Sequence, residues 1–176
     1  KSIDFTSEKL FTLSQNTRDI IKNINEPIKI QLYFSDSLSK DFPQIRNYEK
    51  RVRKLLRDYV RISNNNIKLE VIDPKPFTDI EDLANYYGIQ GLQLNEEGEK
   101  FYFGCVISNS VDDLTVIPFF DIDRERFLEY DLTKTIYNIV NTEKPTIGLI
   151  SSLPVTGGVT SGEEGPKFEE PLFEFF

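Results

Sequence analysis

The sequence has 176 residues, of which 39% are hydrophobic and 28% charged, and this suits one packed domain or one domain plus the start of a second. It contains no His and one Cys, Cys105, which excludes an internal disulfide and a CxxC redox pair and removes the commonest general base and transition-metal ligand. The net charge of −8 argues against nucleic-acid binding, which needs clustered cations.

The charge is unevenly distributed, because residues 1–61 hold 13 basic and 8 acidic residues, a net +5, whereas the remainder is strongly acidic. Met is absent, including at position 1, so we expect the chain to be cut from a longer protein. No signal peptide is visible, and no apolar run approaches the roughly 18 to 20 residues that span a bilayer.

The first predicted elements are a helix and a strand. Ser14 is a plausible N-cap, and Glu26-Pro27 ends the helix because proline disfavours the α conformation in the residue before it. The strand Ile28–Phe34 then alternates apolar and polar residues. The helical spacing that precedes it is given by Leu13, Thr17, Ile20, Ile21 and Ile24.

A long amphipathic helix is predicted to begin at Pro43. Its apolar residues recur every three or four positions, namely Ile45, Tyr48, Val52, Leu55, Leu56, Tyr59 and Ile62. Its opposite face carries Lys50, Arg51, Arg53, Lys54, Arg57 and Arg61. We interpret these cations as a solvated helix face; contact with anionic lipid or a partner is the alternative.

Further strands and helices follow in alternation. A turn at 63–66 leads to a strand over Ile67–Ile72, and a short helix capped by Thr78 or Asp79 carries apolar residues from Ile80 onward and ends at Gly88. Two strands, 100–107 and 114–120, are joined by so short a link that an antiparallel hairpin is expected. A helix is predicted over about 127–140, with Leu128, Leu132, Ile136, Ile139 and Val140 on one side.

The order β-α-β-α-β-β-α predicts the fold class. Strands joined through a helix should be parallel, so the hairpin completes a mixed four-stranded α/β sheet with helices on its faces. This is the order of the thioredoxin fold. The segment from Ala84 to Gly91 also resembles the A-x-x-Y-G-I-x-G stretch that enters the third strand of that fold.

A second α/β subdomain is predicted to begin near the end of the chain. After Pro145, residues 146–151 are typical of a buried strand, and the Gly and Pro residues from Pro154 to Pro166 indicate a loop. We therefore divide the chain into a membrane-proximal segment and helix (1–27), a thioredoxin-like domain (28–144) and the incomplete start of a second α/β subdomain (145–176).

Three stretches resemble GldG-like proteins, accessory components of ABC transport systems linked with gliding motility. The first stretch is Asp4-Phe5-Thr6-Ser7-Glu8-Lys9-Leu10-Phe11-Thr12-Leu13-Ser14, followed by Thr17-Arg18 and residues 26–35. The second stretch covers residues 127–136, Phe-Leu-Glu-Tyr-Asp-Leu-Thr-Lys-Thr-Ile. The third covers residues 145–154, Pro-Thr-Ile-Gly-Leu-Ile-Ser-Ser-Leu-Pro. Together they span most of residues 4–158. The resemblance implies transmembrane helices outside this chain, a periplasmic or otherwise extracytoplasmic location in an inner-membrane-anchored bacterial protein, and an ABC permease and ATPase as partners. The family has no catalytic motif to transfer.

Several candidate sites are weak in this sequence. The loop after the first strand reads Ser35-Asp36-Ser37-Leu38 where a redox protein needs a Cys, and Cys105 lies in an apolar run typical of a buried thiol. Acidic residues at Asp112, Asp113, Asp121, Asp123 and Glu125 lack the spacing of a calcium loop. Gly157-Gly158 has no following Lys-Ser/Thr, and Ser151-Ser152 has no His as a base. The aromatic groups Tyr86/Tyr87, 101–103 and Phe119/Phe120 are expected mainly in the core.

No catalytic, cofactor-binding or metal-binding residue is therefore predicted. The leading hypothesis is a non-enzymatic extracytoplasmic module of an ABC transport system that acts by binding. Two alternatives stay open: a glycan- or peptide-binding receptor, favoured by an exposed aromatic cluster in a cleft, and a hydrolase whose active site lies downstream.

Overall fold

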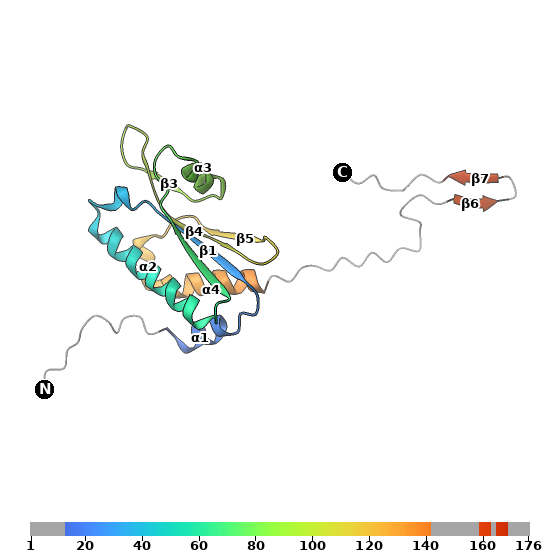
Figure 1. Cartoon of the computed structure of the whole chain (residues 1–176), viewed down its shortest axis with the longest axis horizontal. Helices are drawn as coiled ribbons and strands as arrows, with labels where there is room; N and C mark the ends of the chain where they lie inside the picture. Colours follow the sequence, from blue (N-terminus) through green and yellow to red (C-terminus); the bar gives the residue numbers. More distant parts are fainter. Residues whose placement is uncertain (1–12, 142–158, 163–164, 169–176) are drawn as a thin grey trace. The chain divides into compact units, whose positions relative to one another are not determined.

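The computed structural model describes residues 13–141 and the backbone of residues 159–162 and 165–168 (Figure 1). These residues belong to two separate units, a mixed α/β domain and a small hairpin. Each is described by itself.

A mixed five-stranded sheet forms the centre of the α/β domain. β1 (Ile28–Phe34) runs parallel to β2 (Ile67–Ile72), with Ile28 opposite Ile67, and antiparallel to β4 (Lys100–Ser108). The free edge of β4 is shared by β3 (Gly91–Gln93) and β5 (Leu114–Ile117), both antiparallel to it. The strand order is β2-β1-β4-β3, with β5 also paired to β4.

Helices cover both faces of this sheet. α1 (Gln15–Lys22), α2 (Pro43–Ile62) and α4 (Leu128–Val140) supply the large core cluster with β1 and β4, whereas α3 (Asp79–Tyr86) packs on the other face (Figure 1). In the part of the chain that can be described, no helix combines the length and apolar character that crossing a bilayer requires.

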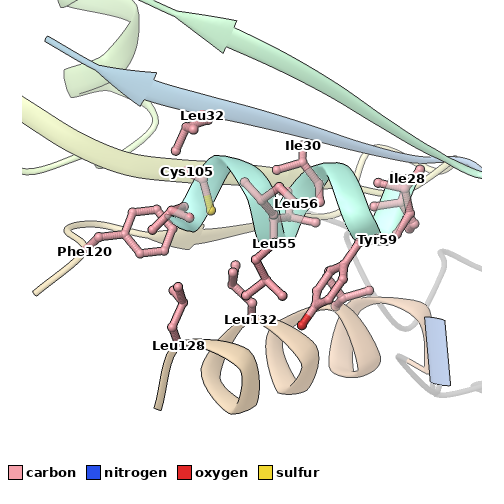
Figure 2. Packing of buried hydrophobic residues seen from close by; sticks show 14 of the residues in the cluster. Ile28, Ile30, Leu32, Leu55, Leu56, Tyr59, Cys105, Phe120, Leu128 and Leu132 are labelled. Atoms are coloured by element: carbon pink, nitrogen blue, oxygen red, sulfur yellow. The ribbon is translucent and has the colours of Figure 1, made fainter. Parts of the chain in front are cut away.

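The main core is built from the alternation in the strands and the helical spacing of α2 and α4. Figure 2 shows Ile28, Ile30 and Leu32 of β1 directed toward Leu55 and Leu56 of α2, and all five are buried. The aromatic rings of Phe34, Tyr48, Phe101, Phe119 and Phe120 surround the ring of Phe103 or one another in mostly edge-to-face contacts. Such packing stabilises the sheet–helix layer beyond simple burial.

The predicted mixed α/β class is confirmed, and so are most elements. β1, β2 and α2 have the expected bounds or start, Ser14 accepts a hydrogen bond from the Thr17 amide as the N-cap of α1, and Gly88 ends α3 with a φ of 88°. The hairpin of β4 and β5 is antiparallel as predicted.

Three details of the domain differ from the sequence prediction. The sheet has five strands because the short β3 pairs with the start of β4. β5 ends at Ile117, since Pro118 has no amide proton to continue the ladder. A 3-10 helix over Ile122–Phe127 precedes α4.

The second unit contains a two-stranded antiparallel hairpin. β6 (Val159–Gly162) pairs with β7 (Gly165–Phe168), and Val159 lies opposite Phe168. The loop predicted from Pro154 to Pro166 is therefore wrong at six positions, 159–162 and 165–166, which lie in these strands. The strand predicted over 146–151 lies outside the described residues.

Candidate binding groove between the first and last helices

A network of hydroxyl groups joins α1, α2 and α4. The Tyr59 hydroxyl from α2 shares a 2.7 Å hydrogen bond with Thr133 Oγ1 on α4, and Thr133 Oγ1 lies 3.4 Å from Thr17 Oγ1 on α1. Figure 2 shows the Tyr59 oxygen directed toward α4. We call Thr17, Tyr59 and Thr133 the hydroxyl seam; because all three are buried, it fixes how α1 lies against α4.

Glu129 extends this contact to the start of α1. The Ser14 amide donates a 2.9 Å hydrogen bond to Glu129 Oε1, and Ser14 Oγ donates to Thr17 Oγ1 at 3.0 Å. Burial acts to raise the pKa of Glu129, but hydrogen bonds from Thr17 and Ser14 and the charge of Arg18 outweigh it, so this pKa is lowered. Glu129 is therefore an ionised structural contact at neutral pH.

A groove of about 540 Å³ lies above the seam, between α1 and α4. Its α1 side is formed by Asn16, Thr17 and Ile20, and its α4 side includes two tyrosines, Tyr130 and Tyr137. These tyrosines are seven residues apart, so they share one side of α4, and they are 63% and 49% exposed. The groove therefore offers ring surfaces and hydroxyl groups to a ligand.

Cations accompany the aromatic rings of the groove. Lys134 Nζ lies 5.7 Å from the centre of the Tyr130 ring in the groove, and the Arg126 guanidinium lies 4.7 Å from the centre of the ring of Phe127, which is outside the groove lining. Lys134 and Arg126 both line the groove, and within residues 13–141 neither forms an ion pair. The site can thus stack on a planar or apolar group and donate hydrogen bonds to oxygen atoms.

A second hollow of about 360 Å³ lies on the other side of Lys134, near the end of β5. Its lining includes Arg124, which binds both carboxylate oxygens of Asp131 at 2.9 to 3.2 Å. These groups already satisfy each other, so we regard the larger α1–α4 groove as the better candidate site.

The residues considered for redox or metal chemistry have structural roles. Cys105 is fully buried between the sheet and the helices, and burial raises the pKa of its thiol to about 12. After β1, Ser35 Oγ accepts the Tyr102 amide proton, and the Ser35 amide donates to the Tyr102 carbonyl oxygen. Neither position presents a reactive group to solvent.

The acidic residues near β5 do not converge. Asp121 caps the 3-10 helix by accepting the Asp123 amide proton, and Glu125 pairs with Arg51. Asp113 accepts a side-chain hydrogen bond from Asn109 at the opposite end of β5. Among the residues with described side chains, no group of three or more His, Cys, Asp or Glu could hold a metal ion.

The aromatic residues are buried even more completely than predicted. Phe101, Tyr102 and Phe103 are all in the core, because α3 covers the face of β4 to which Tyr102 points. Of the aromatic groups considered in the sequence (Tyr86/Tyr87, 101–103 and Phe119/Phe120), Tyr86 on α3 is the largely exposed member, at 83%. Ser151-Ser152 and Gly157-Gly158 lie outside the described residues.

The groove residues were missed by the sequence analysis. Tyr130 and Tyr137 lie on the side of α4 away from its apolar residues, and this spacing was a signal that the sequence contained. What completes the site is α1, more than a hundred residues earlier in the chain, so the pairing is a tertiary feature.

Comparison with known proteins gives a family but no function. An uncharacterized protein of Borreliella burgdorferi is 28% identical over 99% of this chain, which spans about a third of that relative's length (33%). No solved structure matches the chain. The family described as a domain of unknown function, DUF7088, matches residues 7–108, from before α1 to the end of β4. Since this match covers more than half of the sequence, the chain belongs to the DUF7088 family.

Proposed function

We propose that this chain is a non-catalytic binding module in the extracytoplasmic part of a membrane-anchored auxiliary component of an ABC transport system. The α1–α4 groove carries the binding part of this proposal, because it combines exposed rings with cations that lack a carboxylate partner in the domain as described. The transport context and the periplasmic location rest on the resemblance to GldG-like proteins in residues 4–158.

A thioredoxin-like architecture without thioredoxin chemistry is part of the same proposal. Its support is the observed order of strands and helices and the placement of α3 on the face opposite α2 and α4. The segment after β1 supplies Ser35 in place of a reactive thiol. A fold retained without its usual chemistry is consistent with a role based on surfaces.

The partners proposed are the permease and ATPase subunits, contacted directly or through the membrane anchor. The test places a photo-crosslinking amino acid at Tyr137 in the full-length protein in cells, with the same substitution at Tyr86 as the control. Tyr86 is a more exposed tyrosine on α3, outside the groove, so it reports encounters that depend on exposure alone.

The expected product is a covalent adduct from Tyr137 that contains an ABC transport subunit and is much weaker or absent from Tyr86. Equal adducts from both positions, or adducts from Tyr137 that contain no transport subunit, would contradict the proposed partnership.

A glycan- or peptide-binding receptor is the second candidate, and the two exposed tyrosines of the groove favour it. Sugar rings and peptide side chains both stack on such surfaces. Titration of oligosaccharides or peptides into the chain, monitored through the NMR signals of its tyrosines, should shift Tyr130 and Tyr137 and leave Tyr86 unchanged. A ligand that perturbs Tyr86 equally does not bind in the groove.

A further inference from the structure

The outward face of α2 carries a continuous row of basic residues. At 100° per residue, these positions fall within an arc of about 100°, and from first to last they extend about 22 Å along the helix. We call this row the basic stripe; it consists of Arg46, Lys50, Arg53, Lys54, Arg57 and Arg61. Four of its members, from Lys50 to Arg61, are exposed to solvent, while the apolar face of α2 is buried against the sheet.

The stripe is only partly neutralised within the domain. Arg46, Arg53 and Arg61 form ion pairs with Asp36, Glu49 and Asp58. In contrast, no carboxylate of residues 13–141 lies within ion-pair distance of the three central cations, Lys50, Lys54 and Arg57. In a chain whose net charge is −8, this concentration of unpaired cations is a local feature of α2.

We propose that the basic stripe is a docking surface for the anionic headgroups of a lipid bilayer. The positive charge of the stripe favours an anionic partner. Its shape favours a flat partner, because a straight row of side chains on one convex helix can contact a plane along its whole length. Screening limits the reach of exposed charges to about 10 Å, so acidic residues on the far side of the domain do not cancel this attraction.

A bilayer fits these features better than an acidic protein. Specific protein interfaces rely on buried aromatic or aliphatic groups that fill pockets. No stripe residue lines the α1–α4 groove, the hollow near the end of β5 or a smaller hollow beside Asn23 and Asn141, and no large apolar residue within α2 is exposed. Phe42 is 42% exposed just before the start of α2, where an aromatic ring can enter the headgroup region.

The test measures sedimentation of the 176-residue chain with vesicles of phosphatidylcholine, alone or mixed in equal parts with phosphatidylglycerol. The stripe variant combines Lys50→Glu, Lys54→Glu and Arg57→Glu. The control variant combines Lys68→Glu, Lys75→Glu and Lys100→Glu, which are exposed cations outside α2 and give the same change in net charge.

The wild-type chain and the control should bind only the anionic vesicles, and added salt should weaken binding. At roughly fivefold per cation near an anionic surface, loss of three cations weakens binding on the order of a hundredfold, and the stripe variant should lose at least this much because its Glu side chains also repel the surface. A version with Gln at the same three positions, checked by circular dichroism, replaces the Glu variant if that variant does not fold. If the wild-type chain does not bind anionic vesicles, the proposal is overturned and an acidic protein becomes the expected partner of the stripe. If the control variant loses as much vesicle binding as the stripe variant, the proposal is also overturned, because net charge alone then explains the loss. Neither result bears on crosslinking at Tyr137.

Discussion

Two buried tyrosines of this domain have opposite hydrogen-bonding situations and provide a stringent test of the structure. The Tyr59 hydroxyl shares a 2.7 Å hydrogen bond with Thr133, whereas the equally buried Tyr33 hydroxyl has no partner among the residues whose side chains are described. Burial raises the pKa of Tyr33 to about 12, with smaller contributions from Tyr87 and Glu70, and burial also raises the pKa of Tyr59. Both groups are therefore neutral at ordinary pH, and a Phe substitution removes only a hydroxyl.

The Tyr59→Phe substitution should lower the free energy of unfolding by about 1 to 1.5 kcal/mol, the net value of the buried hydrogen bond to Thr133 together with the longer, 3.3 Å contact to the Glu129 carbonyl oxygen. The loss stays at this level because the Thr133 hydroxyl keeps its 3.4 Å contact with Thr17. The Tyr33→Phe substitution should change the free energy by roughly 0 to 1 kcal/mol in the stabilising direction, because it removes a polar group that loses water on folding without gaining a partner.

Urea denaturation followed by far-ultraviolet circular dichroism measures both values, which suits a chain without Trp. The slope of free energy against urea concentration should be the same for all three proteins, since a change in slope indicates an altered unfolded or native state. The reasoning is refuted if Tyr33→Phe destabilises the domain as much as Tyr59→Phe does, because Tyr33 must then have a hydrogen-bond partner.

Three further changes test other parts of the structure. The Gly104→Ala substitution should destabilise the domain by about 2 kcal/mol or more in the same denaturation assay, because its Cβ would lie 2.6 Å from the Ile117 carbonyl oxygen; a neutral result contradicts the close approach of β4 and β5. The Cys105 thiol should react with a thiol reagent at neutral pH only at the rate of unfolding, and fast labelling would show that it is accessible. Because the pKa of Glu129 is lowered on folding, its contribution to stability is present above the unfolded pKa and is lost as pH falls through the folded pKa. The Glu129→Gln variant should therefore be less stable than wild type near pH 7, and the two proteins should become equally stable in acid. A stability difference that does not depend on pH would contradict this reasoning.

The sequence predicts elements well where one period dominates. The strand β1 alternates from Ile28 to Leu32, and α2 combines a 3.6-residue apolar period with Pro43 at its first turn, so both were located correctly. The three-residue β3 has no period of its own and exists because β4 offers an edge to Gly91–Gln93. The β6–β7 hairpin was hidden by its Gly and Pro residues, which are usual in loops.

The candidate site could not be predicted from residue periodicity, because it depends on two helices that are distant in the sequence. In α4, the apolar residues that face the core were predicted, but Tyr130 and Tyr137 on the other side gain meaning only when α1 lies beside them. No local sequence pattern predicts the contact between Thr17 and Thr133. The polar contacts that set this pairing are hydroxyl groups, whose individual sequence signals are weak.

The hydroxyl seam connects the stability of the domain with the geometry of the groove. Thr17 and Thr133 line the groove and are also bonded, directly or through each other, to the buried Tyr59. A buried polar contact of this kind favours one arrangement of its helices, because any shift leaves a hydroxyl without a partner. The Tyr59→Phe substitution removes the bond from α2 to α4 but leaves the Thr17–Thr133 contact between α1 and α4 in place. This variant should therefore lose stability, while a ligand that needs Tyr137 and α1 together should bind to its folded form as it does to wild type; weaker binding would show that Tyr59 also sets the geometry of the groove.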